Sequence, residues 1–185
     1  DAPPAIVATV DHGLRPQAAA EAYHVAGLTA ARGLPHRTLV WEGPKPKTDL
    51  QAAARRARYG LLADLATELG FDAVATAHSL DDQAETLLLR LAHGTGVDGL
   101  AAMPPARPLG RAVRLHRPLL AVPRARLAAT LAEAGITALD DPSNADRGFG
   151  RVRMRALMPA LAAEGMTAAR LAATAARAAR SVAAL

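Results

Sequence analysis

Short apolar runs alternate with longer helical patterns in the first part of the chain, and this alternation constrains the fold more than any other feature. The runs occupy residues 5–10, 36–41 and 73–77, and each is short and apolar enough to form a strand. The segments between them, residues 18–32 and 50–69, space apolar side chains as helices do and end at glycines. Strands and helices in turn predict an α/β fold, a parallel sheet with helices on both faces.

The rest of the chain is expected to be mainly helical. Further helices are predicted over residues 81–92, 123–134 and 152–185. The last of these is expected to break at Met158 and Pro159 and again at Gly165. Residues 103–111 are predicted to be a loop, whereas residues 115–120 suit either a strand or an extended segment.

The first residues indicate that the chain begins inside a longer domain. Asp1 stands in place of a start methionine, and the first apolar run follows almost at once. We therefore expect further residues upstream of Asp1. Within the chain, residues 1–146 are predicted to form the α/β domain, and residues 147–185 a helical linker or the start of a C-terminal helical unit.

Charge is distributed unevenly along the chain, whose formal net charge is +5. Residues 99–132 contain six arginines and no acidic residue, and residues 147–185 contain seven arginines and one acidic residue. Such asymmetry indicates a polyanionic partner, with nucleic acid the first candidate. A solvated basic face is the alternative explanation.

Cysteine is absent from the sequence, and this excludes several kinds of chemistry. Disulfide frameworks, cysteine nucleophiles and cysteine-ligated zinc sites all require it. The sequence also has no signal peptide and no apolar run of membrane-spanning length. A cytoplasmic protein is expected.

Ionisable residues gather in residues 77–86, AHSLDDQAET, at the end of the third predicted strand. His78 ends the strand, and Asp82 and Glu85 are three residues apart on one face of the next helix. Carboxylates in this position are favoured by the helix dipole, can bind Mg²⁺, and can bind or deprotonate an ammonium group. Taken alone, the pattern is explained more simply by an acidic first turn capped by Ser79.

The first predicted strand ends in a similar way, with Asp11 and His12. In parallel sheets, ligands bind beyond the carboxyl ends of the strands. Asp11 and His12 are therefore expected to approach a nucleotide, and ordinary turn residues are the alternative.

Six segments, in order, resemble motifs of the tRNA(Ile)-lysidine synthases, a family of N-type ATP pyrophosphatases with a PP-loop. Each is weak alone, but their order over nearly the whole chain is specific. They are VDHGLR at residues 10–15, LQAAARRARY at 50–59, AHSLDDQAET at 77–86, RLAHGTGVDGL at 90–100, RPLL at 117–120, and DPSNAD at 141–146 with Arg151 and Arg155 after it.

This resemblance implies a fold and a reaction. The fold is that of PP-loop ATPases, which resemble the adenine nucleotide alpha hydrolases. The reaction is a carbon–nitrogen ligation in which ATP adenylates the wobble cytidine of the CAU-anticodon isoleucine tRNA and releases pyrophosphate, after which free L-lysine displaces AMP. ATP, Mg²⁺, tRNA(Ile) and lysine are thus the expected ligands. No membrane partner is expected, and the oligomeric state is left open, with a homodimer as one option.

The resemblance also suggests roles for particular residues. The expected catalytic residues are His78, Asp82 and Glu85, of which Asp82 and Glu85 are also candidate Mg²⁺ ligands. The expected nucleotide- or substrate-binding residues are Asp11, His12, Arg58, Arg151 and Arg153. Simpler explanations exist for several of them: a structural histidine, a surface ion pair or a solvated helix face. Lys45 and Lys47 are candidates for contact with the RNA backbone.

One family motif, the pyrophosphate-binding SGGxDS loop, is expected upstream of Asp1. These 185 residues by themselves are therefore expected to bind ATP poorly and to be inactive. Two other functions stay open. One is tRNA thiolation on the same fold, although thiolases use cysteines and this chain has none. The other is a non-catalytic RNA- or nucleotide-binding relative, which the retained carboxylates argue against and the missing SGGxDS loop argues for.

Overall fold

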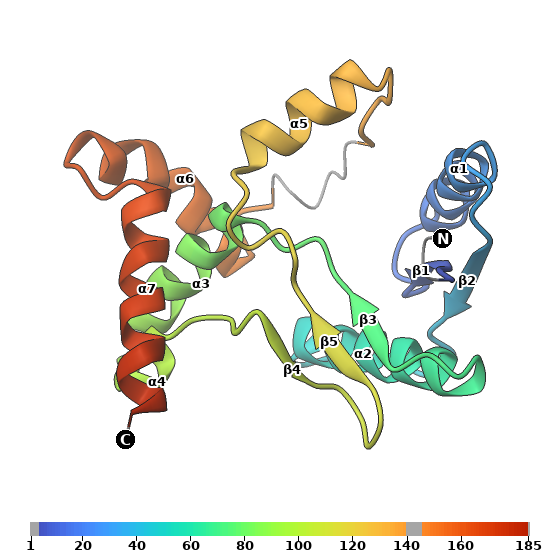
Figure 1. The fold of residues 1–185 in the computed structure, drawn as a ribbon, viewed down its shortest axis with the longest axis horizontal. Coiled ribbons are helices and arrows are strands. Elements are labelled where there is room, and N and C mark those ends of the chain that lie inside the picture. Colours follow the sequence, from blue (N-terminus) through green and yellow to red (C-terminus); the bar gives the residue numbers. More distant parts are fainter. Residues whose placement is uncertain (1–3, 140–145, 185) are drawn as a thin grey trace. The chain divides into compact units, whose positions relative to one another are not determined.

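The computed structural model describes residues 4–139 and 146–184, which fall into two compact units (Figure 1). The first unit comprises residues 1–74 and 108–114, and the second comprises residues 75–107 and 115–185. No helix in the described ranges is long and apolar enough to cross a membrane. Residues 140–145, which include most of the DPSNAD motif, lie outside the described residues.

The first unit is built on two parallel strands. Its elements are β1 (Val7–Asp11), α1 (Ala18–Ala30), β2 (His36–Val40) and α2 (Leu50–Glu68). β1 and β2 pair in parallel, with Val7 opposite His36 and Asp11 opposite Val40. α1 contacts both strands and α2 contacts β1, as the alternation of apolar runs and helices predicts. β1 is half-buried along its whole length instead of fully buried.

Three more short strands form a separate sheet. They are β3 (Ala73–Ala75), β4 (Ala106–Pro108) and β5 (Arg114–His116), in the order β3-β5-β4. The described strands thus form two sheets, where the sequence predicts one. β4 lies within the segment predicted to be a loop. Pro108 obscures it in the sequence, but an edge strand tolerates proline because one side of its backbone needs no partner.

The second unit is mainly helical. Its helices are α3 (Leu80–Ala92), α4 (Val97–Leu100), α5 (Arg124–Glu133), α6 (Gly150–Ala163) and α7 (Ala168–Ala183). The predicted break at Met158 and Pro159 is wrong, since α6 continues through Pro159. The break at Gly165 is confirmed, and this glycine adopts a left-handed φ of 82° between α6 and α7.

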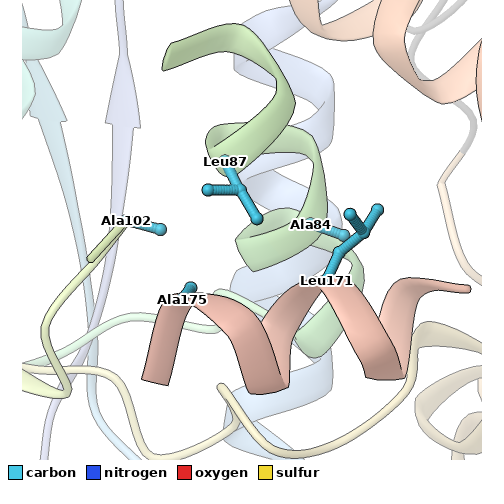
Figure 2. Packing of buried hydrophobic residues seen from close by; sticks show 5 residues of the cluster. All are labelled: Ala84, Leu87, Ala102, Leu171 and Ala175. Atoms are coloured by element: carbon cyan, nitrogen blue, oxygen red, sulfur yellow. The ribbon is translucent and has the colours of Figure 1, made fainter. Parts of the chain in front are cut away.

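An apolar cluster joins α3 to α7 inside the second unit (Figure 2). Ala84 and Leu87 of α3 pack with Leu171 and Ala175 of α7, and Ala102 completes the cluster. The alanines leave room for close contact between the two helices. This packing groups the C-terminal helices with α3 in the second unit. The predicted division into an α/β domain of residues 1–146 and a helical segment of residues 147–185 stays a prediction.

Candidate active site

A capping box builds the first turn of α3. Ser79 is the N-cap residue, and its hydroxyl oxygen accepts a hydrogen bond from the Asp82 backbone N–H at 3.3 Å. In return, Asp82 Oδ2 accepts hydrogen bonds from the Ser79 N–H at 2.7 Å and from the Ser79 hydroxyl at 2.8 Å. The simpler explanation of this sequence motif is therefore correct for one oxygen of Asp82. The other oxygen, Oδ1, faces arginines.

Three arginines from two other helices surround the carboxylates of α3. Arg124, the first residue of α5, places Nη2 3.0 Å from Glu85 Oε1 and 3.4 Å from Asp82 Oδ1. Arg155 of α6 donates from Nε to the same Glu85 oxygen at 2.9 Å. Arg151, also of α6, places Nη1 3.9 Å from Asp82 Oδ1. The structure thus brings together Asp82, Glu85 and Arg151, three of the predicted site residues.

Asp81 links the same turn to α5. Its Oδ2 accepts a hydrogen bond from the Arg124 backbone N–H at 2.7 Å. α5 has no side-chain cap from its own N-cap residue, so Asp81 supplies one from another helix. The carboxylate–arginine cluster therefore contains three carboxylates and three guanidinium groups, from Asp81, Asp82, Glu85, Arg124, Arg151 and Arg155.

Glu85 is the most deeply buried member of this cluster, with 1% of its surface exposed. Its Oε1 accepts hydrogen bonds from Arg124 and Arg155. Its Oε2 is also buried but has no hydrogen-bond partner among the described residues. A buried acceptor without a donor is costly, and a ligand N–H that reached it would remove that cost.

The pKa of Asp82 is lowered from its ordinary value of 3.8. Burial raises this pKa, but the hydrogen bonds from Ser79 and the charges of Arg124 and Arg151 together outweigh burial. Asp82 is therefore ionised near neutral pH. It is suited to hold a cation rather than to carry a proton.

The low pKa of Asp82 predicts how stability depends on pH. Because the folded-state pKa lies below the unfolded one, the stabilisation by Asp82 is complete above the ordinary pKa and is lost as pH falls through the folded value. Asp82→Asn should keep an oxygen for Ser79 but lose the charge. We expect wild type to be more stable than this variant near neutral pH, with the difference shrinking in acid. Urea unfolding at a series of pH values measures the difference in free energy of unfolding between wild type and Asp82→Asn. A difference that does not change with pH would contradict the prediction.

The other residues predicted for this region have local partners. His78 Nδ1 lies 2.9 Å from the hydroxyl oxygen of Thr76. Arg151 Nη2 also donates to Thr86 Oγ1 at 3.2 Å. Arg153 donates to the carbonyl oxygens of Arg147 and Gly148, both at 2.9 Å, so it folds back on its own loop. The catalytic role of His78 and the nucleotide-binding role of Arg153 stay predictions.

Three more of the predicted site residues lie near one another in the first unit, at the end of β1. Asp11 Oδ1 accepts a hydrogen bond from the Gly13 N–H at 2.8 Å, closing a turn in which Gly13 has a left-handed φ of 62°. His12 Nε2 lies 3.2 Å from Arg58 Nη2 of α2. Asp11, His12 and Arg58 therefore form a group within this unit, and their nucleotide-binding role stays a prediction.

Trp41, which directly follows β2, contributes to the surroundings of His12. The two rings meet edge to face, with their centroids 6.0 Å apart. Lys45 lies over the Trp41 ring, 4.1 Å from its centroid, and also donates to the Trp41 carbonyl. Burial and the charge of Arg58 lower the pKa of His12 below 6.5, so its ring is neutral near pH 7. Lys45 is thus engaged with Trp41, while its predicted RNA contact stays a prediction.

The carboxylates of α3 are poorly arranged for a divalent cation. Magnesium prefers a near-octahedral set of oxygen ligands. Here Asp82 and Glu85 direct oxygens at Ser79 and at three guanidinium groups. Among residues 4–139 and 146–184, no group of three or more histidine or acidic residues is placed to hold a metal ion. The predicted magnesium site at Asp82 and Glu85 therefore gains no support from the geometry, and no chemical step is derived from it.

Three members of the cluster, Asp81, Arg124 and Arg155, were not among the predicted site residues. Arg155 lies one helical turn after Arg151, so the spacing of these arginines carried a signal that both face the same neighbour. Arg124 has no such signal. It lies 39 residues from Glu85 in the sequence, and only the fold brings the first residue of α5 next to α3.

Curated relatives extend the resemblance found in the motifs. The chain is 59% identical over 182 residues to the tRNA(Ile)-lysidine synthase of Methylobacterium nodulans, covering 98% of this chain and 53% of that protein. It is 60% identical over 184 residues to the tRNA(Ile)-lysidine synthase of Rhodopseudomonas palustris, covering 99% of this chain and 53% of that protein. The resemblance predicted from the ordered motifs is confirmed. The chain spans about half the length of these relatives.

The fold and the family agree with each other. The U34-tRNA thiolase NcsA from Methanococcus maripaludis, solved with its [4Fe-4S] cluster, aligns with a TM-score of 0.76 at 15% identity, covering 93% of this chain and 61% of the thiolase chain. At this identity the likeness bears on the fold alone, and it confirms the predicted PP-loop α/β class. Residues 2–161 match the family described as the PP-loop domain. The chain is therefore a member of the PP-loop domain family.

Proposed function

We propose that this chain performs the ligation of lysine to tRNA(Ile) as part of a tRNA(Ile)-lysidine synthase. In the proposed reaction, ATP adenylates the oxygen on C2 of the wobble cytidine in the CAU anticodon, releasing pyrophosphate, and lysine then bonds to C2 and replaces AMP. The observation that supports this most directly is the pair Asp82 and Glu85, held at the start of α3 with one buried oxygen lacking a donor. The names of the curated relatives supply the substrates. Because tRNA is used in translation, the reaction would take place in the cytoplasm.

The carboxylates would act on the lysine amine. In the second step, the side-chain nitrogen of lysine bonds to C2 of the cytosine ring, and the bond from C2 to the adenylate oxygen breaks. AMP leaves with that oxygen, and the nitrogen gives up protons. Asp82, which stays ionised, would hold the incoming ammonium. Glu85 Oε2, buried without a partner, would accept a hydrogen bond or a proton from the same nitrogen.

Arg151 has the longest carboxylate contact of the three arginines in the cluster, 3.9 Å to Asp82, which leaves its guanidinium most available to a phosphate of ATP or AMP. Its side chain is 37% exposed, and it contacts Thr86 and Asp82 without being buried by them. The planar guanidinium fork matches phosphate oxygens. The proposal that Arg151 binds nucleotide keeps the role predicted from the sequence.

The outer face of α7 supports a polyanionic substrate. Leu171 and Ala175 are buried against α3, which fixes the inner face of the helix. Arg170, Arg177 and Arg180 are exposed on the opposite side, and residues 165–185 contain no acidic residue. An exposed row of arginines without acidic neighbours attracts a phosphate backbone. We propose that this arginine face of α7 contacts the tRNA.

Replacing Arg170, Arg177 and Arg180 with Gln should weaken tRNA binding at moderate salt. Each lost phosphate contact should lower the slope of log affinity against log salt by about one. Filter binding at several salt concentrations measures both effects. The control replaces Arg32, Arg56 and Arg126 with Gln; these arginines are also exposed, lie outside α7, and their replacement changes the net charge by the same amount. If the two triple variants lose tRNA affinity equally, the proposal that α7 carries a specific tRNA-binding surface is rejected.

The function itself is tested by transfer of labelled lysine. Full-length gene product, ATP, radiolabelled lysine and a tRNA(Ile) transcript with a CAU anticodon should give labelled tRNA, with AMP and pyrophosphate released. Absence of label from the tRNA would refute ligation. Sulfur incorporation would instead identify a thiolase, and tRNA binding without ATP consumption would identify a non-catalytic relative.

A further inference from the structure

Arg124 holds the place that a substrate ammonium would have to occupy. A single nitrogen, Nη2, lies 3.0 Å from a Glu85 oxygen and 3.4 Å from an Asp82 oxygen. One nitrogen between two carboxylates is also how a bound primary ammonium is held. Arg155 differs, because its Nε contacts Glu85 alone among the carboxylates described here.

Access to the carboxylates points to the same residue. Glu85 is almost fully buried, and the side chain of Asp82 is 18% exposed. The side chain of Arg124 is 39% exposed, so its guanidinium borders water. Its backbone N–H is held by Asp81, so the side chain can leave the carboxylates while the start of α5 stays in place.

Charge balance also favours movement of the Arg124 side chain away from Asp82 and Glu85 when an ammonium binds. The carboxylate–arginine cluster has three carboxylates and three guanidinium groups, so its formal charges cancel. An ammonium that joined all six groups would leave one positive charge in excess in a partly buried place, which is unfavourable. If Arg124 turns outward as the ammonium enters, the balance around Asp82 and Glu85 is kept.

We propose that Arg124 is a specificity-determining residue that occupies the amine site until lysine displaces it, and then pairs with the α-carboxylate of that lysine. The inference rests on the proposed function, since it takes lysine as the substrate. A guanidinium expelled from two carboxylates has lost its partners. The α-carboxylate of an amino acid provides a new, matching partner, whereas a plain diamine does not. Arg124 would therefore select lysine over cadaverine, which has the same carbon chain and terminal amine but no carboxylate.

The test compares lysine and cadaverine as acceptors of the activated tRNA, in the full-length protein with ATP and tRNA(Ile). For wild type we expect a strong preference for lysine in kcat/KM. In Arg124→Gln, the amine site has no competing cation and the α-carboxylate has no partner. The preference should fall by about tenfold or more, partly through a gain for cadaverine. Loss of a residue with only a structural role would lower kcat/KM equally for lysine and for cadaverine. An unchanged ratio of these two kcat/KM values would therefore overturn the proposal.

Two further variants complete the test. Arg126→Gln removes an exposed arginine two residues along α5 and should leave the ratio at the wild-type value. Arg124→Lys keeps a cation in place, so the ratio of kcat/KM for lysine to that for cadaverine should stay within about threefold of wild type. A ratio as low as that of Arg124→Gln would show that the positive charge at this position does not set the preference. If wild type does not transfer lysine at all, the proposed function fails. If it transfers lysine but Arg124→Gln keeps the preference, only the role of Arg124 fails.

Discussion

Replacing Glu85 with Gln is expected to slow lysine transfer by about 100-fold or more, with much less effect on adenylation of the tRNA by ATP. Glutamine has nearly the same shape, but it is uncharged and cannot take a proton from an amine. A 100-fold loss corresponds to about 2.7 kcal/mol of activation free energy. That value lies within the range of about 1.5–3 kcal/mol for hydrogen bonds to charged groups.

The two half-reactions separate this effect from general damage. Pyrophosphate release in the presence of tRNA and ATP reports adenylation, and labelled lysine reports transfer. Glu68→Gln is the matched control, because Glu68 is an exposed acid whose surface ion pair with Arg37 is worth at most about 1 kcal/mol. Lysine transfer at the wild-type rate in Glu85→Gln would rule out a catalytic role for this carboxylate.

Truncating Leu87 to Ala should destabilise the second unit by about 2–5 kcal/mol, the largest effect on stability expected from a single substitution here. Leu87 is 1% exposed and lies at the centre of the cluster that joins α3 to α7 (Figure 2). Its loss leaves a cavity between helices that are already close-packed through alanines. Such helices have little room to move together and fill it.

Leu91→Ala is the control for this substitution. Leu91 belongs to the same helix and undergoes the same chemical change, but it is 50% exposed, so its effect should be within about 1 kcal/mol. Urea unfolding followed by circular dichroism gives both free energies. Similar values for the two variants would mean that the contact between α3 and α7 contributes little to stability.

Much of the fold could be predicted because its signals are local. The helices follow from apolar spacing and from glycines that adopt left-handed φ, as at Gly33 and Gly70. The cap that Ser79 forms at the start of α3 also depends on neighbouring residues and was predicted from the sequence, although its reciprocal bond from Asp82 was not. The predicted helix break at Pro159 was wrong because a helix can continue through proline when the surrounding structure supports it.

The arrangement of the candidate site was only partly predictable. The acidic turn of α3 was visible, but its cationic partners come from distant segments: Arg124 lies 39 residues from Glu85, and Arg155 lies 70 residues from it. No local pattern encodes such pairs, because they depend on where the fold places the start of α5 and helix α6 relative to α3. For the same reason the sequence suggested a metal between Asp82 and Glu85, where the structure places guanidinium groups.

The hydrogen bond from the Arg124 backbone to Asp81 has a kinetic consequence. With the start of α5 held in place, the guanidinium can leave the carboxylates by side-chain rotation alone. Rotamer changes of exposed side chains take picoseconds to nanoseconds, whereas movements of whole helices take microseconds or longer. Enzymes typically turn over about 1–1,000 times per second. Breaking the two ion pairs of Arg124 adds to the barrier for this rotation, but no helix has to move for arginine and amine to exchange on the carboxylates.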